Sequence, residues 1–157
     1  MQQVPNGVEG GFDFTGRNSN AEALDASVKG VQPYGATNMS AVSLGGISSA
    51  QGSRSMAVNN KTIAKGDESF AQGYCSVALG DSSFAGGEKT VAYGLAAVSL
   101  GSLTIAEGKY SHASGEKSHA KGQAAHAEGY DTHAEEVATH AEGSGTYATA
   151  PYTHAEG

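Results

Sequence analysis

The sequence has no tryptophan, three prolines, a single cysteine (Cys75) and no apolar run long enough to cross a membrane. One cysteine cannot form a disulfide within the chain. So little proline excludes collagen, which needs abundant proline as well as glycine at every third position. A transmembrane helix needs about 20 consecutive apolar residues. We therefore expect no membrane insertion.

Basic residues are also scarce, with nine Lys and Arg against sixteen Asp and Glu and a net charge of −7. No basic cluster is present, so we expect neither nucleic acid nor an anionic membrane surface as a partner. The first residues, MQQVPNGVEGGFDF, lack the basic and apolar regions of a secretory signal peptide. We expect either that a leader has been removed or that the protein leaves its cell by another route.

Large apolar side chains are few, because hydrophobic residues make up 38% of the chain and much of that is alanine. An ordinary globular enzyme needs more large side chains to build its core. The chain is rich instead in glycine, with 23 residues. Scattered glycines would indicate disorder, whereas periodic glycines would indicate a repeat fold.

The glycines are periodic. From residue 41 to residue 157 the chain consists of seventeen units with a period of seven, without one insertion or deletion, and the last unit ends at its fifth position. Position one is Ser or Thr in fourteen units, position three is Ala in fifteen, and position five is Gly in fourteen. The exceptions at position five are Asn59, Glu136 and Ala150. Residues 1–40 lack the repeat, which gives two regions, 1–40 and 41–157.

The unit predicts β-strands. Each glycine inside a helix costs about 1 kcal/mol, and a coiled coil needs large apolar residues at its core positions. The fixed positions are spaced by two, which is the period of a strand. We therefore expect an all-β solenoid in which each unit is a five-residue strand and a two-residue turn. Two strands would form a 14-residue coil, with small residues filling a thin interior and coils about 4.8 Å apart.

Glycine at position five would either adopt a positive φ or leave out a Cβ for which there is no room. Asn59 suits the first role, because Asn tolerates the left-handed region. Glu136 and Ala150 suit neither role, so we expect local distortion at both.

Positions two and four would point outward and expose long apolar columns in a monomer, which isolated soluble proteins avoid. We therefore expect burial against further copies of the chain in a cyclic assembly. Three chains would close a compact prism, although this reasoning does not fix the number. The candidates for the subunit interface come from both faces of the solenoid and are Val42, Leu44, Met56, Val58, Val77, Leu79, Val91, Tyr93, Val98 and Leu100.

All six histidines occupy position two. Four of them are spaced by one coil, so we expect a column of His112, His126, His140 and His154. Around a threefold axis, such a column could hold a metal or an anion, or it could become unstable when protonated below about pH 6.5. Alternatively the histidines are structural and donate to Glu128, Glu135, Glu142 or Glu156. No other cofactor is expected.

No catalytic constellation is evident. Ser or Thr at position one should point inward and His at position two outward, which separates nucleophile from base. No phosphate-binding loop occurs. We therefore expect that the protein is not an enzyme. The inward threonines also disfavour ice binding; they are Thr62, Thr90, Thr104, Thr132, Thr139 and Thr153.

Residues 1–40 suit either a cap over the open strand edge of the solenoid or a docking segment that joins other proteins of a particle. Phe12 and Phe14 are a plausible apolar anchor. Residues 21–28 could form one or two helical turns after Asn20.

The units at 76–87 (SVALGDSSFAGG) and 97–108 (AVSLGSLTIAEG) resemble the head repeats of YadA-like trimeric autotransporter adhesins. The resemblance covers residues 41–157 and implies a left-handed parallel β-roll that is homotrimeric and binds host surfaces. The histidine-rich units at 118–129 (SHAKGQAAHAEG) resemble repeats of phage and prophage tail-fibre proteins. In that group the repeats can precede a self-cleaving C-terminal chaperone domain.

These resemblances imply a structural and attachment protein of a virion, a tail fibre that contacts a host receptor or glycan. The alternative is the head of a bacterial trimeric autotransporter adhesin at the cell surface. We favour the virion hypothesis.

Overall fold

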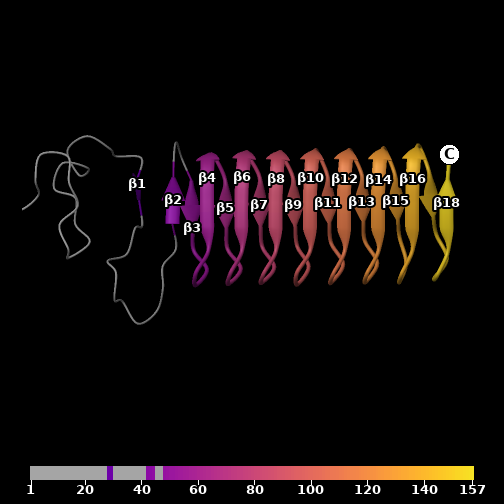
Figure 1. Ribbon diagram of the computed structural model, residues 1–157, viewed down its shortest axis with the longest axis horizontal. Coiled ribbons are helices and arrows are strands. Elements are labelled where there is room, and N and C mark those ends of the chain that lie inside the picture. Colours follow the sequence, from indigo (N-terminus) through magenta and orange to yellow (C-terminus); the bar gives the residue numbers. More distant parts are fainter. Residues whose placement is uncertain (1–27, 30–41, 45–47) are drawn as a thin grey trace, which may run out of the picture.

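The computed structural model describes residues 28–29, 42–44 and 48–157, and within these residues it contains strands and turns but no helix. The strands form a β-solenoid whose coils stack along one axis (Figure 1). Each coil contributes one long and one short strand, and the two strands belong to two different sheets. The predicted all-β solenoid with 14-residue coils is therefore confirmed.

The first sheet, which we call the long-strand sheet, contains ten strands in the order β1-β2-β4-β6-β8-β10-β12-β14-β16-β18. From β2 onward each strand pairs in parallel with the strand fourteen residues later, so that Val98 lies beside His112. The bounds are β1 Val28–Lys29, β2 Val42–Leu44, β4 Met56–Asn60, β6 Phe70–Tyr74, β8 Phe84–Glu88, β10 Val98–Ser102, β12 His112–Glu116, β14 His126–Tyr130, β16 His140–Ser144 and β18 His154–Glu156.

The second sheet, the short-strand sheet, contains eight parallel strands of two residues each. The prediction of two equal five-residue strands per coil was therefore wrong. Strands begin at position two of the unit, and only those of the long-strand sheet reach five residues. The bounds are β3 Ser49–Ala50, β5 Ile63–Ala64, β7 Val77–Ala78, β9 Val91–Ala92, β11 Ile105–Ala106, β13 His119–Ala120, β15 His133–Ala134 and β17 Tyr147–Ala148.

Small residues fill the interior, as predicted. The buried apolar residues are all alanines, and the buried polar residues are all serines and threonines. Five of the six threonines that were expected inward are at most 1% exposed. Thr153 is exposed, because it lies in the last coil and no further coil is stacked on it.

Glycine at position five has both of the expected roles, one in each sheet. Gly101 follows the long-strand pattern with a φ of +113°, and an added Cβ would lie 2.0 Å from the carbonyl oxygen of Gly115. Gly108 follows a short strand without a left-handed φ, and its Cβ would lie 1.9 Å from the carbonyl oxygen of Gly122. Asn59 takes a φ of 80°, as expected of its side chain.

The expected distortion at Glu136 is small. In the preceding coil the amides of both Lys121 and Gly122 donate to the carbonyl oxygen of Ala134. At Glu136 that pattern is reduced to one bond, from the amide of Glu135 to the carbonyl oxygen of Ala148 at 3.0 Å. Ala150 lies in the last turn, where no further coil approaches it.

Position seven has a property that sequence reasoning missed. From Arg54 to Tyr152, every residue at this position adopts a left-handed φ between 52° and 67°, and Gly145 is the one glycine among them. The signal was present in the sequence, because Val, Ile and Thr do not occur at position seven in these coils.

The N-terminal predictions fall mostly outside the described residues. The anchor at Phe12 and Phe14 and all but the last residue of the helical turns predicted over residues 21–28 belong to that part of the chain; at Val28 the prediction was wrong, because this residue lies in a strand. Val28 and Lys29 form β1, which pairs antiparallel with Ser43 and Leu44 of β2.

Candidate functional site

An apolar column follows the outer surface of the long-strand sheet. Its members at position two are Met56, Phe70, Phe84 and Val98, on adjacent strands. The rings of Phe70 and Phe84 stack with 5.2 Å between their centroids and 3° between their planes. Met56 is 39% exposed and the other three are half-buried. Large side chains that could have formed a core therefore lie outside it.

The adjacent column, at position four, carries no charge over the same strands. Gly86 leaves space for its neighbours, because an added Cβ would lie 3.1 Å from both the Phe84 ring and the Leu100 side chain. We call this surface the apolar face; it consists of Met56, Val58, Phe70, Gln72, Phe84, Gly86, Val98 and Leu100. Position four of the short-strand sheet differs, since over the same coils it reads Lys65, Leu79, Tyr93 and Glu107.

The predicted interface residues divide between the two sheets. Met56, Val58, Val98 and Leu100 lie on the apolar face. The other four with described side chains lie on the short-strand sheet; they are Val77, Leu79, Val91 and Tyr93. Val42 and Leu44 are in register with Met56 and Val58, but their side chains lie outside the described residues.

Beyond Val98 the apolar column continues as histidine. His112, His126, His140 and His154 lie one above the other on the long-strand sheet. Successive imidazole centroids are 4.7, 4.7 and 4.6 Å apart. The short-strand sheet carries a second column, which consists of His119, His133 and Tyr147.

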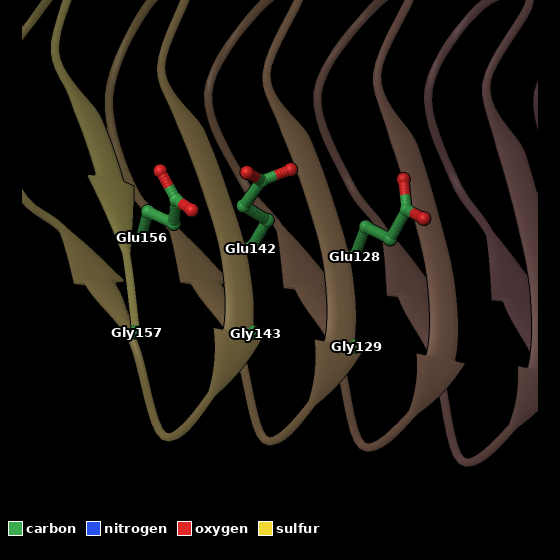
Figure 2. A pocket seen from close by; sticks show the side chains of 6 residues that line it. All are labelled: Glu128, Gly129, Glu142, Gly143, Glu156 and Gly157. Atoms are coloured by element: carbon green, nitrogen blue, oxygen red, sulfur yellow. The ribbon is translucent and has the colours of Figure 1, made fainter.

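Three glutamates form a second column beside the histidine column of the long-strand sheet. Glu128, Glu142 and Glu156 project from β14, β16 and β18 and line a surface hollow with Gly129, Gly143 and Gly157 (Figure 2). Their carboxylates lie on adjacent strands because the pairing is in register. Three like charges on neighbouring strands repel one another, so nearby imidazoles or cations would stabilise them.

The Glu142 carboxylate lies between two imidazoles. Its Oε2 is 3.6 Å from Nε2 of His140, and its Oε1 is 3.6 Å from Nε2 of His154. One ligand atom from each of the three residues can be chosen so that all lie within 4.8 Å of one another. The arrangement therefore brings two nitrogen donors and one carboxylate together from two adjacent strands.

Other histidines contact carboxylates of their own strand or of a neighbouring coil. Nε2 of His126 lies 3.3 Å from Glu128, and Nε2 of His119 lies 3.1 Å from Glu107. Nδ1 of His133 lies 3.7 Å from Glu135. Glu128, Glu135 and Glu142 therefore lie near imidazoles, as expected, but the structure gives none of them the expected hydrogen bond from a histidine. The structure describes no such contact for Glu156; instead the terminal His154 contacts Glu142 across the strands.

Several imidazole nitrogens have no hydrogen-bond partner. Nε2 is buried and has no hydrogen-bond partner in His112, His126 and His140. His112 has Ser114 where His126 has Glu128. Burial, together with the neighbouring His126, lowers the pKa of His112 below its ordinary value of 6.5.

Hydroxyl groups and imidazoles are separated by the sheet. Ser111 and Ser118 are at most 1% exposed in the interior, whereas His112 and His119 lie on the outer surface. The arrangement can therefore bind a ligand through imidazole and carboxylate groups, but it does not pair a hydroxyl nucleophile with a histidine base within a strand.

No protein-family model and no curated protein matches this chain. Within the described residues, no helix is long and apolar enough to cross a membrane.

Proposed function

We propose that this chain is a structural and attachment protein, a homotrimeric β-solenoid segment of a tail fibre in a phage or phage-like particle, and that it is not an enzyme. The observation that carries the proposal is the apolar face, which a single chain leaves uncovered. In this proposal the particle holds the rod and presents it to a host receptor or glycan.

The apolar face suits burial against another copy. The core of the solenoid contains only small side chains, so the large ones of β4 to β10 are left on the surface. Isolated soluble proteins rarely expose continuous apolar surface, and the centres of subunit interfaces are poor in charged residues. The apolar face meets both criteria, whereas over the same coils the short-strand sheet carries two charges at position four, Lys65 and Glu107.

The virion assignment is supported by the histidine-rich units, which resemble tail-fibre repeats. Residues 1–40 would then join the rod to other particle proteins. The adhesin-head alternative is supported by the apolar units at 76–87 and 97–108. Genome context discriminates between the two, because a tail fibre should be encoded beside other tail genes and an adhesin head should be joined to a membrane anchor.

Sedimentation equilibrium of the full chain tests the assembly. We expect a trimer at micromolar concentration and dissociation of that trimer by Phe84→Glu, which places a charge on the apolar face. The matched control is Gln123→Glu, which adds the same charge at an exposed turn and should leave the trimer intact. A monomeric unaltered chain at micromolar concentration would overturn the proposal.

A further inference from the structure

We propose that His140, Glu142 and His154 form a binding site for a divalent transition-metal ion such as Zn²⁺. All three ligands come from one chain, so the site does not depend on the proposed trimer. It goes beyond the proposed attachment function, because it assigns a ligand to a part of the surface that differs from the apolar face.

The backbone fixes the positions of the three ligands. His140 and His154 are paired residues on β16 and β18, and Glu142 lies two residues after His140 on the same outer face. The imidazoles stack with 4.6 Å between centroids and 5° between planes. One carboxylate oxygen is directed to each imidazole, at 3.6 Å. The three donors therefore face a common point between two coils.

The chemistry of the donors suits zinc and its neighbours. Two imidazoles and one carboxylate are a ligand set of open zinc sites, in which water or an external ligand takes the fourth position. Bonds of about 2.0 to 2.2 Å in tetrahedral geometry require donor atoms roughly 3.3 to 3.5 Å apart. The present separations need to shrink by up to about 1.5 Å, which rotation of the side chains can supply without moving the strands.

The side chains are free enough to make that movement. The side chains of His140 and Glu142 are each 37% exposed, and that of His154 is 53% exposed. The Nε2 atom of His140 has no hydrogen-bond partner. A metal ion would satisfy this nitrogen and would neutralise part of the glutamate column.

The neighbouring coils explain why the site is local. Between His112 and His126 the equivalent of Glu142 is Ser114, which removes the carboxylate. Between His126 and His140 the carboxylate of Glu128 contacts His126. Among the residues that the structure describes, the group of His140, Glu142 and His154 is the one that brings three such donors within 4.8 Å.

Calorimetric titration of the full chain with ZnCl₂ at pH 7.5 tests the site, and the absorption spectrum of bound Co²⁺ reports its geometry. We expect one ion per chain. His154→Phe and Glu142→Ser should each weaken binding by roughly 10- to 100-fold or more, since even loss of an outer partner costs that much. Glu142→Ser places at this position the residue that the strand of His112 carries naturally, Ser114.

The matched control is His112→Phe, which makes the same substitution beside Val98 in an earlier coil and leaves the three ligands in place. It should bind Zn²⁺ with unchanged affinity. No saturable binding by the unaltered chain would overturn the site, and so would unchanged affinity in either His154→Phe or Glu142→Ser. Sedimentation of the same samples reports assembly separately, so a failure of metal binding is distinguishable from a failure of the trimer.

Discussion

At the scale of single residues, glycine at position five shows how one residue type meets two physical demands. Within the long strands it allows a positive φ, and in both sheets it lets the backbone of the next coil approach to a distance that excludes a Cβ. The α-carbon of the position-five glycine in one coil therefore lies directly against a carbonyl group of the next coil.

Gly101 and Gly145 separate these two demands. Gly101 has a φ of +113° and an obstructed Cβ position, whereas Gly145 has a φ of +67° and no atom within 4 Å of an added Cβ. We expect Gly101→Ala to lower the free energy of unfolding by about 3 kcal/mol or more, and Gly145→Ala by about 1 kcal/mol. Urea denaturation measures both. Equal losses would show that close coil stacking does not limit this position.

His112 should make stability depend on pH. Burial, with the neighbouring His126, lowers its pKa below 6.5 in the folded chain, and Glu128 opposes this shift more weakly. The unfolded chain then binds more protons than the folded chain, so the free energy of unfolding falls as the pH drops below about 6.5. Above that pH the contribution is complete.

Proton NMR of the imidazoles measures this directly, with an expected midpoint for His112 below 6.5. His112→Phe should reduce the slope of the melting temperature between pH 7 and pH 5. A midpoint at or above the ordinary value would contradict the assignment of His112 to a desolvated site.

At the scale of the elements, the period of seven and the inward face could be predicted because they depend only on which positions are small. The inequality of the two strands could not, since both follow the same seven-residue template. A weak signal was nevertheless present in the exceptions. Asn59 lies within the long strand β4, where position five has a positive φ, whereas Glu136 and Ala150 follow short strands, where it does not.

The histidine column could also be predicted from the sequence, because its members are spaced by the length of one coil. The contact of His154 with Glu142 was not, because side-chain rotation decides whether a carboxylate approaches its own strand or the next. The sequence therefore predicts the column but not the group of three donors.

The left-handed backbone at position seven can be tested by substitution with glycine. Ala124 is exposed and has a φ of 56°, a conformation that costs roughly 1 to 2 kcal/mol for a residue with a Cβ. After the greater flexibility of unfolded glycine is subtracted, Ala124→Gly should raise the free energy of unfolding by about 0.5 to 1 kcal/mol. The control Ala127→Gly, in the buried core, should lower it. Destabilisation by Ala124→Gly in urea denaturation would refute this account of the turn.

At the scale of the whole molecule, contacts are made between neighbouring coils, so the rod behaves as a quasi-one-dimensional repeat protein. Such a structure leaves both of its broad surfaces available to partners. The distribution of charge distinguishes them, since the apolar face is uncharged and the short-strand sheet is not.

This difference predicts which surface the subunits share. Val91→Glu, on the short-strand sheet, should leave the trimer intact, whereas Phe84→Glu should dissociate it. Both side chains are half-buried in the single chain. Circular dichroism of the two variants should therefore show that neither substitution unfolds the chain. If sedimentation shows that Val91→Glu alone dissociates the assembly, the subunits meet through the other sheet.

The uniform offset of fourteen residues between paired strands has a consequence for how such a rod changes in evolution. Removing one complete coil joins two surfaces that already match, whereas removing seven residues places a five-residue strand beside a two-residue strand. Length should therefore vary in whole steps of about 4.8 Å. Duplication or loss of a coil would therefore change the length of the rod without any change in the residues of its interior.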